Sequence, residues 1–254
     1  MGKRKKRNKI DTICIFCLAR PSEEGEHVFP KSWYPSTTPP NVQRVVVPVC
    51  GICADEFEIA ERKFSLPLLT MLDTNNPDGA SVVETLQRSW QFERAPSLKE
   101  SVRRIQRHQS IMRQIKYKVR SPDDPSPWQF YVPARTPAGL HVMAAPTLTL
   151  EHKVTAKICE KFVRGLHYHE LGVPLPIETP IKVRWPDDLN PEFRAAYRQL
   201  PLNSSLAPGL RYRVVRDDKS SFWVFYLWGQ IEFTAFAGKM PSERKEELSE
   251  ADSK

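Results

Sequence analysis

Glycine is scarce in this chain of 254 residues and proline is abundant, with 10 glycines against 23 prolines. Because proline interrupts helices and stiffens connections, this balance predicts many short elements rather than long uninterrupted helices. The shortage of glycine also argues against the glycine-rich loops that cradle phosphate groups. No internal repeat is present.

Long apolar runs are absent as well. No stretch approaches the roughly 20 apolar residues that span a bilayer. The basic first ten residues are not followed by the apolar segment of a secretory signal. We therefore expect a cytoplasmic protein without a membrane partner. In that compartment paired cysteines are more often metal ligands than disulfides.

The net charge is positive, at +8, from 38 Lys and Arg residues against 30 Asp and Glu residues. Such a charge fits a polyanionic partner such as nucleic acid, but it also serves solubility. Residues 1–10 hold six Lys or Arg and are expected to be a disordered basic tail, either merely solvated or contacting phosphate. A second charged tail is expected over residues 241–254.

Four of the five cysteines form two pairs with the same spacing, Cys14-x2-Cys17 and Cys50-x2-Cys53, separated by 32 residues. Each pair offers two thiolates from one tight turn, and two such pairs suit a tetrahedral zinc ion. Because all four ligands would come from the protein, this zinc is expected to be structural. Cys159 stands alone in an apolar helical pattern and is expected to be a core residue.

Residues 11–73 are expected to form the module that carries these cysteines. Within it, residues 44–50 (RVVVPVC) predict a short strand. A helix is expected to begin at Ala54 and to end before Pro67, because the residue that precedes a proline avoids helical angles. Its buried face is expected to consist of Phe57, Ile59, Ala60 and Phe64. The turn-rich stretch 74–79 (TNNPDG) is the expected boundary of the module.

Residues 80–240 are expected to form an α+β accessory or target-recognition domain, with a helical first part. Helical patterns cover residues 81–92 and 97–120. In the second pattern Ser97 is the expected N-cap, with Glu100 at the spacing of a capping box. Two short strands or a hairpin are expected after it, over 128–133 and 139–144.

The last third of the chain combines a strong helical pattern with β-branched and aromatic strands. Residues 147–172 give the clearest helix, with Gly172 as its stop signal. Its apolar residues recur four apart, at Val154, Ile158, Phe162 and Leu166. After residue 180 the pattern predicts an antiparallel sheet packed with this helix, so the expected fold class is α+β. If both faces of the sheet are apolar, one face is expected to meet a protein partner or a second copy of the chain.

The stretch between the cysteine pairs holds an acidic residue beside a histidine, Glu26-His27, followed by Lys31. A neutral imidazole is a competent general base near pH 7. A carboxylate suits a hard divalent cation, and a lysine nearby can meet a phosphate. His152 does not lie between cysteine pairs as His27 does. His167 and His169 are two residues apart on a predicted helix, so their side chains point in different directions. These three histidines are therefore expected to be ordinary core or surface residues.

The order of these motifs is similar to that of a known family. Cys-x2-Cys, then Glu-His-x2-Pro-Lys-Ser over residues 26–32, then Val-Cys-x2-Cys leading into a helix resembles the zinc-bearing HNH endonucleases, or His-Me finger nucleases. The resemblance covers residues 11–70 and is vaguer beyond them, where the chain resembles uncharacterised bacterial proteins with such a finger. It implies an N-terminal treble-clef (ββα-metal) zinc finger.

The resemblance also implies roles. His27 would be the general base and Glu26 a ligand of Mg²⁺ or Mn²⁺, an ion that would polarise the scissile phosphate. The implied function is metal-dependent hydrolysis of phosphodiester bonds, with DNA favoured as the substrate and an RNA-directed nuclease as an alternative. A restriction or phage-defence setting is an analogy only.

Two positions depart from the family pattern. The family has Asn or His directly after the last zinc cysteine, as a second metal ligand, and this chain has Ala54. Asp55 or Glu58, nearby on the helix, could substitute. Asn41 lies further from Cys50 than the central Asn of the family does from its cysteine. The alternative to an active nuclease is therefore a degenerate zinc finger that binds nucleic acid or a protein.

Overall fold

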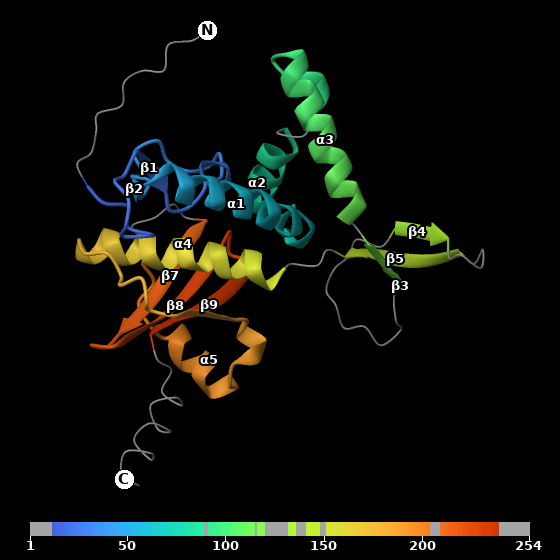
Figure 1. Ribbon diagram of the computed structural model, residues 1–254. Coiled ribbons are helices and arrows are strands. Elements are labelled where there is room, and N and C mark those ends of the chain that lie inside the picture. Colours follow the sequence, from blue (N-terminus) through green and yellow to red (C-terminus); the bar gives the residue numbers. More distant parts are fainter. Residues whose placement is uncertain are drawn as a thin grey trace, which may run out of the picture.

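The computed structural model describes residues 12–88, 91–114, 116–119, 132–135, 141–147, 151–203 and 209–238. Residues 1–10 and 241–254, where the two charged tails are expected, lie outside this part. Within it, five helices occur together with sheets whose strands are all antiparallel, which confirms the α+β class (Figure 1).

The N-terminal part consists of a two-stranded antiparallel ladder and a helix. Strand β1 (Glu24–His27) pairs with β2 (Val46–Val49), so that His27 lies opposite Val46 and Glu26 opposite Val47. A 3₁₀ turn, η1 (Lys31–Trp33), lies between them. Helix α1 (Gly51–Met71) follows β2 directly, with Cys50 as its N-cap.

Helix α1 differs from its prediction in both extent and buried face. It continues through Pro67, so the predicted end was wrong. A proline removes one backbone hydrogen bond, and burial of Phe57 and Phe64 on the same helix outweighs that loss. Ile59 is 48% exposed rather than buried, since it lies about 200° around the helix from Phe57.

The prediction against long helices was wrong as well. Helix α1 has 21 residues and α4 (His152–Leu171) has 20. Several prolines fall where a helix tolerates them, and Pro77 and Pro191 are the first residues of α2 (Pro77–Arg88) and α5 (Pro191–Arg198). Proline content alone therefore does not limit helix length.

In the middle of the chain, α2 is followed by a 3₁₀ turn, η2 (Phe92–Arg94), and by α3 (Leu98–Gln114). The Glu100 backbone N–H donates to the Ser97 side chain at 3.2 Å, which confirms the predicted N-cap. The helix predicted to reach residue 120 is shorter, because residues from Lys116 form strand β3.

A three-stranded antiparallel sheet follows α3. Strand β3 (Lys116–Val119) and strand β4 (Val132–Arg135) both pair with β5 (His141–Thr147), in the order β3-β5-β4. Strand β5 overlaps the strand predicted over 139–144, and β4 overlaps the one predicted over 128–133 only at residues 132 and 133, since residues 128–131 lie outside the described part. Strand β3 was missed because its partner lies 25 or more residues away, where a local pattern cannot show it.

The C-terminal part is a four-stranded antiparallel sheet in the order β6-β9-β8-β7, as predicted after residue 180. Its strands are β6 (Ile181–Arg184), β7 (Leu210–Arg216), β8 (Ser220–Leu227) and β9 (Ile231–Gly238). A 3₁₀ turn, η3 (Pro186–Asp188), precedes α5. Helix α4 ends at Gly172 in the left-handed region, with φ 70°, which confirms the predicted stop.

Helix α4 is the central layer, lying between α1 and the C-terminal sheet (Figure 1). The Phe162 ring contacts Phe29 at 4.5 Å on one side and Phe225 at 5.5 Å on the other, measured between centroids. Trp228 donates from its indole to the Trp33 carbonyl at 2.7 Å. One hydrophobic core therefore runs across the expected boundary at 74–79.

Candidate functional site

The two cysteine pairs come together at the junction of β2 and α1. The Sγ atoms of Cys14, Cys17, Cys50 and Cys53 all lie within 4.8 Å of one another. Cys17 and Cys50 are separated by 3.9 Å between sulfurs, close to the edge of about 3.8 Å in a tetrahedron of zinc–thiolate bonds. The predicted cluster is confirmed, and its four soft donors fit a metal ion such as zinc.

The first pair lies in a tight turn that the backbone holds closed. The Leu18 N–H donates to the Cys14 carbonyl at 3.0 Å, and Leu18 has a left-handed φ of 50°. Burial acts to raise the pKa of Cys17, but hydrogen bonds from the backbone of Ala19 and Arg20 lower it to about 7. A thiol with this pKa readily supplies the thiolate that a metal requires.

Glu26 and His27 are adjacent in the sequence but belong to opposite faces of the β1–β2 ladder. Side chains alternate along a strand, so Glu26 shares its face with the buried Val47, which lies opposite it. His27 shares the other face with Val46, which is 48% exposed. The structure therefore directs Glu26 inward and His27 outward.

The inward Glu26 carboxylate binds a lysine of α4. The distance from Lys161 Nζ to Glu26 Oε1 is 2.5 Å, and the same ammonium also contacts the carboxylate of Glu61 on α1. Lys161 is completely buried, and its ammonium also lies 5.5 Å from the centroid of the Phe57 ring. Burial raises the pKa of Glu61 above its ordinary value, in opposition to the attraction of Lys161.

The proposed substitutes for the missing helix ligand do not join this cluster. Asp55 is exposed on α1, and Glu58 pairs with Arg62 at 3.3 Å with a side chain that is 66% exposed. Ala54 is buried beside the cysteines, and Asn41 is exposed in the loop before β2. Glu61 is instead the α1 carboxylate that shares a cation with Glu26.

No role was predicted from the sequence for Lys161 or Glu61, although each is a charged residue at a position where the helical period predicts burial. Glu61 falls between Phe57 and Phe64 at helical spacing, and Lys161 falls within the apolar stripe of α4. A charged residue at a position that the period assigns to the core must find a buried partner. The partner itself could not be inferred, because it lies 100 residues away in the chain.

His27 is half-buried, and its surroundings keep it uncharged. Burial lowers its pKa below the ordinary value of 6.5, and the positive charges of Lys31, Arg44 and Lys161 lower it further. Within the described part of the chain, its buried Nδ1 has no hydrogen-bond partner. The imidazole is therefore neutral near pH 7 and able to accept a proton.

Two exposed cations lie close enough to His27 to influence its pKa. Lys31 begins η1, and Arg44 precedes β2 and lies over the ring of Tyr34 at 4.9 Å from its centroid. Tyr34 is almost fully buried, and burial raises its pKa to about 12, so it stays a neutral platform. This outer surface, defined by His27, Lys31 and Arg44, suits an anionic ligand.

The remaining histidines do not form a metal site in the described residues. His152 and His169 are exposed. Burial lowers the pKa of His167, which lies near Arg216 and Glu170. Arg216 pairs with Glu170, and the same carboxylate accepts from the Tyr212 hydroxyl, so these residues fix α4 to β7.

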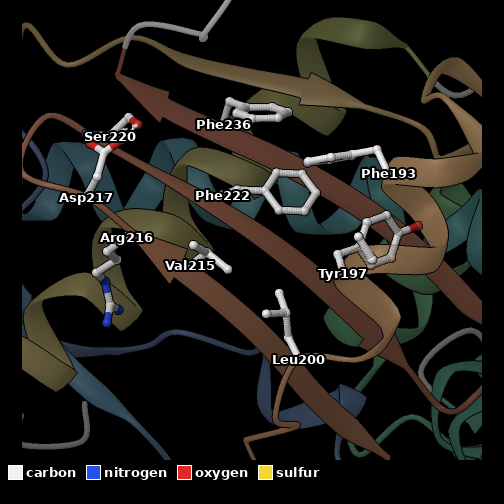
Figure 2. A pocket seen from close by; sticks show the side chains of 10 residues that line it. Phe193, Tyr197, Leu200, Val215, Arg216, Asp217, Ser220, Phe222 and Phe236 are labelled. Atoms are coloured by element: carbon white, nitrogen blue, oxygen red, sulfur yellow. Dashed lines mark hydrogen bonds between the residues drawn. The ribbon is translucent and has the colours of Figure 1, made fainter.

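Both faces of the C-terminal sheet are apolar, and α5 covers the second one only in part. Phe193 and Tyr197 of α5 contact Phe222, with ring centroids 4.9 and 5.6 Å apart. A shallow apolar pocket remains beside them, reaching Val215 and Phe236 (Figure 2). Most of the aromatic residues of β8 and β9 are core residues.

Comparison with known proteins gives no relative. No family model, no curated protein and no solved structure matches this chain. Any assignment of the part that carries the cysteines therefore depends on its own motifs and geometry. Within the part of the chain that the structure describes, every helix is too short or too polar to cross a bilayer.

Proposed function

We propose that this chain binds nucleic acid at the outer surface of His27, Lys31 and Arg44 and hydrolyses phosphodiester bonds there. The observation that carries the proposal is a neutral, half-buried imidazole placed beside two exposed cations. A neutral imidazole accepts protons, and exposed Lys and Arg side chains bind phosphate oxygens. DNA is the preferred substrate, in line with the resemblance to HNH endonucleases.

In this mechanism the His27 imidazole takes a proton from water as the water oxygen forms a bond to phosphorus. The bond from phosphorus to the leaving oxygen breaks, and Lys31 and Arg44 stabilise the charge that develops on the phosphoryl oxygens. The lowered pKa of His27 keeps the base unprotonated at neutral pH. Proton transfer and charge stabilisation thus come from residues of one surface.

The four cysteines hold a structural zinc ion in this proposal. The order of turn, ladder, second cysteine pair and helix supports the proposal of a treble-clef finger. The ion ties the turn at Cys14–Cys17 to the start of α1 and so fixes β1, which carries His27. With four protein thiolates the zinc has no open position and takes no part in hydrolysis.

A catalytic Mg²⁺ or Mn²⁺ ion does not fit the residues as they are arranged. Glu26 points away from the face of His27 and already binds the ammonium of Lys161. No step of the mechanism is therefore assigned to a divalent cation.

A second candidate is binding of nucleic acid without hydrolysis, by a degenerate finger. The observation that favours it is the contact of Glu26 with Lys161, which leaves no carboxylate beside His27 to orient a cation. The absence of a hydrogen-bond partner for the Nδ1 atom of His27 in the described residues also favours binding without hydrolysis, since a general base is usually oriented by a second group. The two candidates share the binding surface and differ only in chemistry.

The test compares binding and cleavage on the same samples. Zinc-loaded protein is incubated with plasmid DNA and with single-stranded DNA and RNA, in EDTA-free buffer with and without Mg²⁺ or Mn²⁺. We expect wild type to nick DNA, and His27→Ala to lose at least about 100-fold of the rate, the usual contribution of a general base. Binding of labelled DNA by His27→Ala should stay within a few-fold of wild type.

Exposed cations elsewhere provide the matched control. Arg44→Gln should weaken DNA binding and reduce its salt dependence, whereas Arg62→Gln, on the exposed side of α1, should not. Salt-dependent binding without cleavage of any substrate would support the degenerate finger. Cleavage that survives His27→Ala would refute the role of the imidazole, and absence of both activities would refute both candidates.

A further inference from the structure

A fully buried lysine lies between two carboxylates that come from different elements. Glu26 belongs to β1, Glu61 to α1 and Lys161 to α4, and the ammonium contacts both acids. The side chains of the acids are only 21% and 17% exposed, and the lysine is not exposed at all. Such a group is seldom buried without a charged partner.

The two carboxylates resemble the ligands of a metal-cation site, but the cation between them is the ammonium group of Lys161. Two carboxylates that converge on one point are a ligand set that a hard divalent ion prefers. The ammonium lies at that point and contributes a single positive charge against two negative ones. Burial raises the pKa of Glu61, and the ammonium acts against that rise.

The packing of α4 keeps the ammonium in place. A methyl group added at Gly165 would lie 2.5 Å from Val28, the residue that follows β1, so the helix is in close contact there. Phe162, next to Lys161, contacts Phe29 at 4.5 Å between ring centroids. The lysine therefore cannot leave the carboxylates unless α4 moves away from the finger.

We propose that the Lys161 ammonium takes the place of a divalent cation between Glu26 and Glu61, so that the chain binds no such ion there. Removal of the ammonium should open a divalent-cation site made of the two carboxylates. The inference goes beyond the proposed function and does not depend on it, because cation binding at this cluster is measured without any substrate. It also accounts for Ala54, since a site filled by lysine needs no further ligand from the start of α1.

The test measures binding of Mn²⁺ alone to zinc-loaded protein, by electron paramagnetic resonance and by calorimetry. Wild type, Lys161→Met and the double variant Lys161→Met/Glu61→Gln are compared. Lys157→Met is the matched control, because Lys157 lies one turn earlier on α4 and contacts Glu56 and Glu160 at the surface. Zinc content and circular dichroism show that each protein is folded.

We expect no Mn²⁺ site at Glu26 and Glu61 in wild type or in Lys157→Met. Lys161→Met should gain one site that binds at least ten-fold tighter than any site in wild type, and the double variant should lose it. Should Lys161→Met be unstable, added Mn²⁺ should raise its melting temperature and leave that of wild type unchanged.

Two results would overturn the inference. One is a Mn²⁺ site in wild type that Glu26→Gln abolishes, because the lysine would then yield to a metal. The other is a folded Lys161→Met that gains no Mn²⁺ site. A nuclease assay that fails would leave both readouts unaffected, so the two proposals are tested separately.

Discussion

Three positively charged side chains lie near His27, and together with burial they determine the pH at which its imidazole takes up a proton. Lys31 follows it in η1, Arg44 precedes β2, and Lys161 reaches toward the strand from α4. Burial and these charges both favour the neutral imidazole. Because the pKa of the folded state is lower than that of the unfolded chain, falling pH protonates the unfolded chain first. The stability that His27 contributes is therefore present above about pH 6.5 and is lost as pH falls toward the folded pKa.

We predict that NMR titration places the His27 pKa below 6.5, and that Arg44→Gln raises it. Arg62→Gln, which changes a cation on the exposed side of α1, should leave it unchanged. If His27 is the base, the acid limb of the cleavage profile should move to higher pH in Arg44→Gln. A His27 pKa above 6.5 in the wild-type protein would contradict the neutral imidazole.

At the scale of single residues, the sequence predicts which cysteines form the metal cluster, but it does not predict which residues surround Glu26 and His27. The repeated Cys-x2-Cys spacing is enough to predict the cluster, because each pair needs only its own turn. The side-chain direction of Glu26 and His27 depends on which face of β1 is covered. That face is decided by α4, more than 100 residues later, and no local pattern reports it.

At the scale of elements, the contact of α4 with Val28, the residue that follows β1, can be tested at Gly165. In an ordinary helix interior, alanine in place of glycine stabilises by about 0.5–1 kcal/mol. Here the added Cβ would lie 2.5 and 3.1 Å from the two methyl groups of Val28. We predict that Gly165→Ala lowers the free energy of unfolding by about 1–3 kcal/mol, the usual range for overpacking.

The control is the same change made in a smaller neighbour. In a Val28→Ala background the clash is removed, so Gly165→Ala should be neutral or stabilising in urea denaturation. The double-mutant cycle should therefore show a coupling energy of the order of 1 kcal/mol or more. Strict additivity of the two changes would show that α4 does not approach β1 as closely as described.

Element prediction succeeds where the signal is periodic and local. Helix α4 follows from its apolar stripe and Gly172, and α3 begins where the capping box places it. Element prediction fails where packing against distant residues determines the secondary structure. Examples are helix α1, which continues past Pro67, and strand β3. In both cases the element depends on a partner that is remote in sequence.

At the scale of the whole molecule, the N-terminal part that carries the four-cysteine cluster and the C-terminal sheet share one core. Trp33 contacts both Phe64 of α1 and Trp228 after β8, with ring centroids 5.6 Å apart in each pair. Gln230 also accepts from the Asp73 backbone N–H. We therefore expect the two parts to unfold together.

Removal of the zinc ion that we propose for the four-cysteine cluster tests this expectation. Structural zinc contributes about 10–16 kcal/mol in zinc-finger peptides, as much as the whole stability of a typical domain. We predict that chelation, or Cys17→Ser, causes loss of helical and near-ultraviolet circular dichroism in one transition. Cys159→Ser should keep its zinc, because Cys159 is buried in α4 away from the cluster. A sheet that stays folded after chelation would show two independent units.

Lys161 is far along the chain from the two acids that it contacts, and this separation determines when the three residues can meet during translation. Glu26 and Glu61 precede Lys161 by 135 and 100 residues. At a translation rate of about 5–20 residues per second, Glu61 leaves the ribosome at least about 5 s before Lys161. Throughout that interval the nascent N-terminal segment presents two carboxylates without their counter-charge. The arrival of α4 thus completes the charge balance of a segment made long before it.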